Sequence, residues 1–90
     1  MPTLLLKPTG KVYGGDWGEH DFVVMYNDRS VGRIFLNPTH YVEAPWMWTI
    51  TVVVPGFTLS GSNGHAVDRN AAMKAFRSKW DQAGMDGRLR

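Results

Sequence analysis

One run of eleven residues constrains the fold of this chain more than any other part. It begins at Pro45 and ends at Pro55, and the enclosed residues are rich in tryptophan, valine and threonine. Aromatic and β-branched side chains favour a half-buried pleated surface, and proline favours the ends of strands over their interiors. Positions 46, 48, 50, 52 and 54 are all apolar, whereas the alternate positions include two threonines. We therefore expect a central strand at 46–54 with one face in the core.

A β-hairpin is predicted ahead of this strand. Residues 21–26 and 31–36 each have the composition of a strand. Between them, Asn27 and Asp28 are residues that tolerate the left-handed backbone of a tight turn. Gly32 lies inside the second strand, which indicates either a bulge or the close approach of another backbone.

The first twenty residues carry weaker signals. Residues 3–6 are a candidate for a short edge strand and residues 11–13 for a second one, although four glycines interrupt the segment. Trp17 stands alone among glycine and acidic neighbours. We expect its ring to cap the core from a loop, with an exposed aromatic contact as the alternative.

A helix is predicted after a long connection. Residues 55–67 are rich in glycine and serine, which predicts an irregular loop. Asp68 is a good N-cap, the apolar spacing that follows predicts a helix over 69–83, and Gly84 suits a left-handed C-cap. Residues 85–90 have no apolar period, so we expect them to be disordered. The apolar stripe of the helix consists of Ala72, Met73, Phe76, Trp80 and Ala83.

Together these elements predict a single α+β domain over residues 1–84, followed by the disordered tail. Its two layers are an antiparallel three-stranded sheet and one C-terminal helix packed on one face, in the order β-β-β-α, because each has one apolar face to bury. A fourth short strand at the N-terminal edge is an option. The simplest packing runs the helix antiparallel to the strand at 46–54. Trp80 would then cover Trp48, and Trp46 would remain partly exposed beside loop residues such as Tyr41 or Trp17.

The composition excludes several classes of protein. With 43% hydrophobic and 20% charged residues, the chain is neither disordered nor a membrane protein by composition. It has no cysteine, so disulfides and thiolate metal sites are excluded and a cytoplasmic location is expected. There is no signal-peptide pattern. The net charge of +2 permits an anionic partner without requiring one.

Residues capable of catalysis or metal binding form no recognisable motif. His20, His40 and His65 lack the spacing of metal ligands. The acidic residues near His20 and the serines near His65 are more simply explained as solvated loops. The glycine-rich segment at 61–64 lacks the phosphate-loop pattern. We therefore expect no enzyme activity, no metal and no cofactor.

Three segments together carry a resemblance to known proteins. They are Val-Gly-Arg-Ile at 31–34, Pro-Trp-Met-Trp at 45–48 and the alanine-rich segment at 71–80 that ends in tryptophan. The combination resembles a group of small uncharacterised bacterial proteins, over roughly residues 22–83. That resemblance implies a stand-alone cytoplasmic bacterial domain and no particular activity. In layout alone the chain is also similar to antitoxin-like domains and to the three-strand-plus-helix DNA-binding domains of some integrases.

Our leading hypothesis is a small non-enzymatic domain that binds a protein partner or a second copy of itself. The predicted contact residues are Trp46, Trp17 and Tyr41, because exposed aromatic side chains on a rigid framework are common binding hot spots. Weak nucleic-acid binding by the open face of the sheet is the alternative. That face would include positions 47, 49, 51 and 53, joined by Arg29 and Arg33 from the hairpin, and it is poor in positive charge and in aromatic rings.

Overall fold

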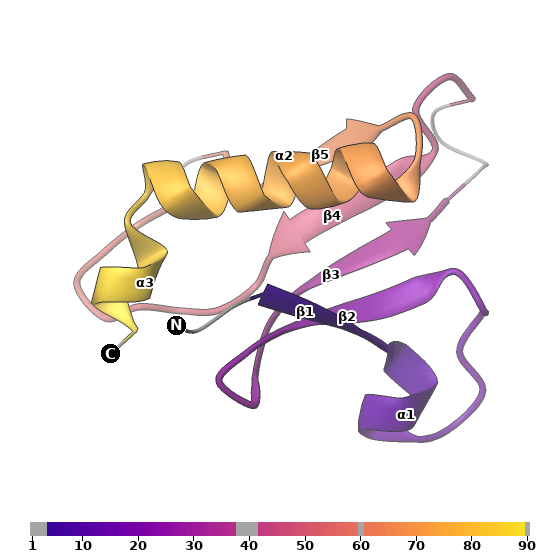
Figure 1. The fold of residues 1–90 in the computed structure, drawn as a ribbon, viewed down its shortest axis with the longest axis horizontal. Helices are drawn as coiled ribbons and strands as arrows, with labels where there is room; N and C mark the ends of the chain where they lie inside the picture. The colour runs from indigo at the N-terminus through magenta and orange to yellow at the C-terminus, as the bar shows by residue number, and fades with distance from the viewer. Residues whose placement is uncertain (1–3, 38–41, 60, 90) are drawn as a thin grey trace.

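The computed structural model describes residues 4–37, 42–59 and 61–89 (Figure 1). Five antiparallel strands form one sheet in the order β1-β2-β3-β4-β5, and the long helix α2 lies along one face of it. The predicted α+β class, with an antiparallel sheet and a C-terminal helix, is confirmed. The elements are β1 (Leu4–Pro8), α1 (Thr9–Tyr13), β2 (Asp21–Tyr26), β3 (Arg29–Leu36), β4 (Trp46–Ile50), β5 (Asn63–Ala66), α2 (Arg69–Gln82) and α3 (Met85–Arg88).

The predicted number of strands, three with an optional fourth, was too low. The optional strand at the N-terminal edge exists as β1, whereas residues 11–13 belong to the short helix α1 and not to a strand. The fifth strand, β5, lies inside the segment that we expected to be an irregular loop. Its sequence, Asn-Gly-His-Ala, has low strand propensity. Pairing with β4 makes it a strand, with Trp48 opposite Gly64 and Met47 opposite His65.

The extra strand reverses the expected direction of the helix. β4 ends at Ile50, before the predicted end at residue 54, and β5 returns antiparallel to it. The helix α2 therefore runs in the same direction as β4 (Figure 1). The expectation that Trp80 covers Trp48 is wrong. The Trp48 ring instead meets Phe76 with 6.2 Å between centroids, and Trp80 packs on Tyr26 at 5.3 Å.

The local signals in the hairpin are confirmed. Asn27 and Asp28 have φ angles of 50° and 61°, as a two-residue type I′ turn requires. Gly32 marks a close approach: an added Cβ would lie 2.4 Å from both Phe76 Cε2 and the Thr49 carbonyl oxygen. The hairpin also has a bulge beside it: Gly32 pairs with Val24 and Ser30 with Met25, so the extra residue is Val31, in the same strand as Gly32.

The ends of α2 also follow the prediction. Asp68 Oδ1 accepts a hydrogen bond from the Ala71 amide at 2.7 Å, and Gly84 has the left-handed φ of 64°. Beyond Gly84, however, the expected disordered tail is wrong for the described residues. They form α3, in which Met85 is 1% exposed and Asp86 accepts a 2.7 Å hydrogen bond from Trp80 Nε1. One buried methionine produces no apolar period, so this turn has no signature in the sequence.

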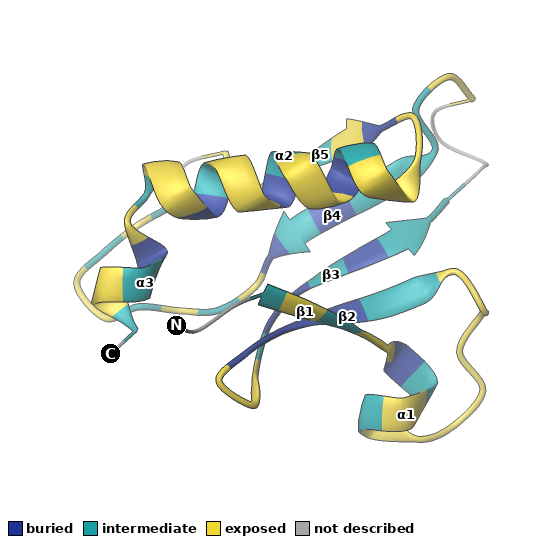
Figure 2. Ribbon diagram, in the orientation of Figure 1, coloured by how far each residue is buried: buried dark blue, intermediate teal, exposed yellow. Residues whose placement is uncertain are grey.

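Each face of the sheet is covered by a helix over only part of its width (Figure 2). On one face α2 lies over β3, β4 and β5, and the main core fills the space between them. Val23 and Met25 alternate with core residues along β2, so they point to the opposite face. There α1 contacts β1 and β2, and both side chains are buried.

A candidate binding groove between β1 and α2

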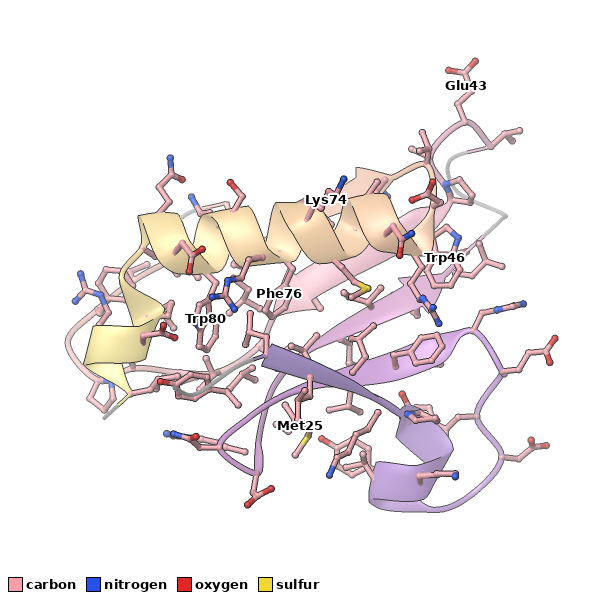
Figure 3. The ribbon with its side chains drawn as sticks, viewed as in Figure 1. Met25, Glu43, Trp46, Lys74, Phe76 and Trp80 are labelled. Carbon is pink, nitrogen blue, oxygen red and sulfur yellow. The ribbon has the colours of Figure 1, made fainter. Side chains whose placement is uncertain are left out.

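An apolar groove opens on the α2 side of the sheet, over β1 and β2. It encloses about 180 Å³. Strand residues form its floor, and α2 supplies one wall. Figure 3 shows Phe76 directed from α2 toward the sheet and Lys74 on the other side of the helix. The lining residues are Leu4, Leu5, Leu6, Val24, Ile34, Met73, Phe76 and Arg77.

The groove follows from the ratio of helix width to sheet width. Neighbouring strands lie about 4.8 Å apart, and a helix with its side chains is about 10 Å across. One helix therefore covers two or three strands of a five-stranded sheet. Because α2 lies over β3, β4 and β5, its side chains reach as far as Tyr26 of β2, and the same face of β1 is left without a helix of its own.

The chemistry of the groove suits apolar side chains. Among its described lining residues Arg77 is the one charged group, and Arg77 Nε donates a 3.2 Å hydrogen bond to Asp81 Oδ2. The volume lies below the roughly 300–1,000 Å³ of small-molecule sites, and close to the roughly 150 Å³ of a cavity that holds one benzene ring. Met73, exposed on the wall, is a side chain that adapts its shape to a partner. The groove can hold one or two apolar side chains.

A second surface lies on the opposite face of β3, β4 and β5, beside the part that α1 covers. Cross-strand pairing places Phe35 opposite Met47, and Met47 opposite His65, so these three side chains form a row. In the described structure Phe35 and Met47 are half-buried and His65 is exposed. This row combines an aromatic ring, a thioether and an imidazole on the face of the sheet that α2 does not cover.

Arg33 lies next to this row and its charge is already compensated. Its guanidinium forms an ion pair with Asp21, including an Nε–Oδ1 hydrogen bond of 3.3 Å. The buried Thr9 also donates to Asp21 Oδ1, at 2.5 Å. Rings flank the cation, with Phe35 4.8 Å and Trp17 5.4 Å from it. The cluster ties α1 and the loop after it to β2 and β3.

The predicted contact residues do not form one site. Trp17 is 42% exposed on the Arg33 side of the sheet, and its Nε1 donates to the Gly14 carbonyl oxygen at 2.7 Å. Trp46 is half-buried on the α2 side, near the start of α2 (Figure 3), with the His20 ring 5.8 Å away. Tyr41 lies outside the described residues. The two tryptophans thus occupy opposite faces, and Trp46 does not have the Trp17 neighbour that we expected.

One feature of the sequence points toward the groove. Leu4, Leu5 and Leu6 are three consecutive leucines, and on an edge strand they cannot all enter the core. Met73 also lies at the margin of the helix stripe rather than at its centre. Neither feature locates a groove until the position of α2 over the sheet is known.

Comparisons with known proteins leave the chain without a family assignment. No family model matches it, and neither curated proteins nor solved structures gave a match. The resemblance to small bacterial proteins therefore stays a prediction. None of the described helices is long and apolar enough to cross a membrane. Over residues 4–37, 42–59 and 61–89, no group of three His, Asp or Glu side chains is placed to hold a metal ion.

Proposed function

We propose that this domain is a non-enzymatic protein-binding module whose groove receives the apolar side of a partner helix. The observation that carries the proposal is the groove itself, which has a strand floor, one helical wall and an apolar lining. A single ionisable side chain in that lining, already paired with Asp81, offers no acid–base pair for catalysis.

The dimensions of the open area favour a helix as the bound element. A helix packed beside α2 would have its axis about 8–10 Å away, or two strand spacings, which places it over the β1 side of the sheet. Val24 and Tyr26 of β2 are already buried there, so its apolar side would meet the half-buried Leu4 and Leu6 of β1. A second helix placed there would lie beside α2 on the same face and complete the layer. Helix-in-groove recognition uses apolar residues at positions i, i+3, i+4 and i+7 of the bound helix. One or two of these anchors would fill the cavity next to Met73 and Phe76.

A selection experiment tests this function with helical peptides in place of the natural partner. A displayed library of amphipathic helical peptides is selected on the wild-type domain, and the enriched peptides are titrated against two variants. Met73→Glu places a carboxylate on the groove wall, one helical turn before Arg77. A bound apolar side chain would have to remove that charge from water, so we expect affinity to fall at least about tenfold, or by about 1.4 kcal/mol.

The matched control is Ser78→Glu. It makes the same change of charge at an exposed position of α2 that does not line the groove. The affinity of this variant for the selected peptides should stay within about twofold of wild type, a difference well under 1 kcal/mol. Failure to enrich any helical peptide, or equal binding by Met73→Glu and wild type, would contradict the groove as the binding site.

Nucleic-acid binding is a second candidate, favoured by the row on the opposite face. The sequence placed too few aromatic rings on that face, whereas the structure adds Phe35 and Trp17 beside Arg33. If single-stranded nucleic acid stacks there, Phe35→Ala should weaken binding by about 1–3 kcal/mol, and affinity should fall as salt rises. Fluorescence anisotropy with labelled oligonucleotides measures both effects. Binding that is absent at low salt, or insensitive to Phe35→Ala, would exclude this surface.

A further inference from the structure

The edge of the sheet formed by β1 is open in a way that edge strands of monomeric proteins usually avoid. An edge strand presents backbone N–H and C=O groups that can pair with another chain, and proteins block such edges with charges, prolines or bulges. In β1 these blocking residues, Lys7 and Pro8, come at the C-terminal end. The segment before them, Leu4 to Leu6, contains no charge, proline or bulge, and Leu5 is 55% exposed.

From this edge we infer a symmetric dimer, in which β1 pairs antiparallel with β1 of a second copy around a twofold axis. The two five-stranded sheets would then become one continuous sheet. This inference goes beyond the proposed function, because it uses the backbone edge of β1 rather than the groove over β1 and β2. The occupant of the edge is the same strand of another molecule.

The sequence of β1 is complementary to itself in one register. When the twofold axis passes through Leu5, this residue faces its own copy, and Leu4 faces Leu6 of the partner chain. Residues directly opposite each other share a face of the sheet. Leu4 and Leu6 therefore meet on the α2 side and the two copies of Leu5 meet on the other side. Each central cross-strand pair is leucine against leucine.

Shifting the two β1 strands by two residues along each other keeps the α2 sides of both sheets on the same side, but this register is less favourable. With the axis through Leu6, Leu5 would face Lys7, and Leu4 would face Pro8, which has no N–H to donate. In the favoured register the two copies of Lys7 lie four residues apart along the strand. At about 3.3 Å per residue their separation is about 13 Å, beyond the roughly 8 Å over which charges act in physiological salt. Repulsion between them is therefore screened.

Two variants test the dimer by its mass in analytical ultracentrifugation. Wild type should sediment as two chains, and Leu5→Glu as one chain, because two carboxylates would face each other at the centre of the interface. The control Val53→Glu makes the same change of charge at a residue that is 79% exposed and outside the strands, and it should remain dimeric. A circular dichroism spectrum like that of wild type shows that each variant is folded.

Cysteine substitution tests the register directly, because the chain has no cysteine of its own. Leu5→Cys should form an intermolecular disulfide on oxidation, since opposite residues lie about 4.5–5.5 Å apart. Lys7→Cys should not, because its copies are about 13 Å apart. A wild-type protein that stays monomeric, a dimer that survives Leu5→Glu, or equal cross-linking of both cysteine variants would overturn the inference. Leu5 also lines the groove, so the two proposals are separated by Met73→Glu, which changes α2 and not the edge of β1: it should lose peptide binding and still sediment as two chains.

Discussion

Replacing Gly32 with alanine is expected to destabilise the domain by about 3 kcal/mol or more, the upper range for overpacking a filled interior. The added Cβ would lie 2.4 Å from Phe76 Cε2 and 2.4 Å from the carbonyl oxygen of Thr49. The Phe76 ring is 1% exposed within the core, and the carbonyl belongs to the backbone of β4. The change would therefore push α2 and β4 away from β3 together. Alanine in place of glycine inside a strand ordinarily stabilises by about 0.5–1 kcal/mol, so steric overlap reverses the sign.

Gly87→Ala is the matched control for this substitution. Gly87 lies in α3, and an added Cβ would meet no atom within 4 Å. Because alanine favours a helix over glycine by up to about 1 kcal/mol, this variant should be as stable as wild type or slightly more so. Urea unfolding followed by tryptophan fluorescence measures both free energies of unfolding. A Gly32→Ala protein within about 1 kcal/mol of wild type would show that α2 and β3 are not held at this distance.

Trp80→Ala should cost about 3–5 kcal/mol, as other buried aromatic truncations do. Trp80 is 0% exposed and packs on Tyr26 and Phe76, with ring centroids 5.3 Å and 6.0 Å away. Its Nε1 also donates a hydrogen bond to Asp86, so the same side chain fixes α3. Domains of this kind have a total stability of about 5–15 kcal/mol, and this loss would leave many of them partly unfolded.

The comparison that makes this prediction specific is Trp17→Ala, because Trp17 is a tryptophan on the other face with substantial exposure. Its removal should cost no more than about 1 kcal/mol. Urea unfolding should be followed by far-ultraviolet circular dichroism, since both changes alter the fluorescence. Trp80→Phe separates packing from hydrogen bonding, and we expect it to lose about 1 kcal/mol for the bond to Asp86. Equal losses from Trp17→Ala and Trp80→Ala would contradict the assignment of the core.

Local physical chemistry explains what the sequence predicted well. The Asn27-Asp28 turn, the Asp68 cap and the apolar stripe through Phe76 each depend on residues within one or two turns of chain. Such signals are complete in a short window of sequence. The hairpin and the long helix are therefore predictable from the sequence alone.

Elements that depend on distant partners could not be placed in this way. β5 is a strand because it pairs with β4, although its own residues have low strand propensity. Missing it also reversed the predicted direction of α2, and with it the partner expected for Trp80. The buried turn of α3 depends on one methionine and one hydrogen bond, which no periodic pattern records.

The candidate site was predictable only in its parts. The run of leucines at 4–6 was visible, and so was the aromatic character of Trp17 and Trp46. Whether these residues meet depends on which strands α2 covers and on the turn that α1 makes at the end of β1. Those arrangements place the leucines in a groove and separate the two tryptophans onto opposite faces.

The two edges of this sheet differ, and the difference limits how far assembly could proceed. β1 carries three leucines at its edge, whereas β5 at the other edge has four residues, of which Asn63 and His65 are polar and exposed. A sheet with two adhesive edges adds molecules at both ends and polymerises into a fibre. In a sheet with one such edge, that edge is buried in the dimer and no further molecule can pair with it. Pairing through β1 would therefore be self-terminating, and a mutation that made β5 longer and apolar would turn a closed pair into a growing filament.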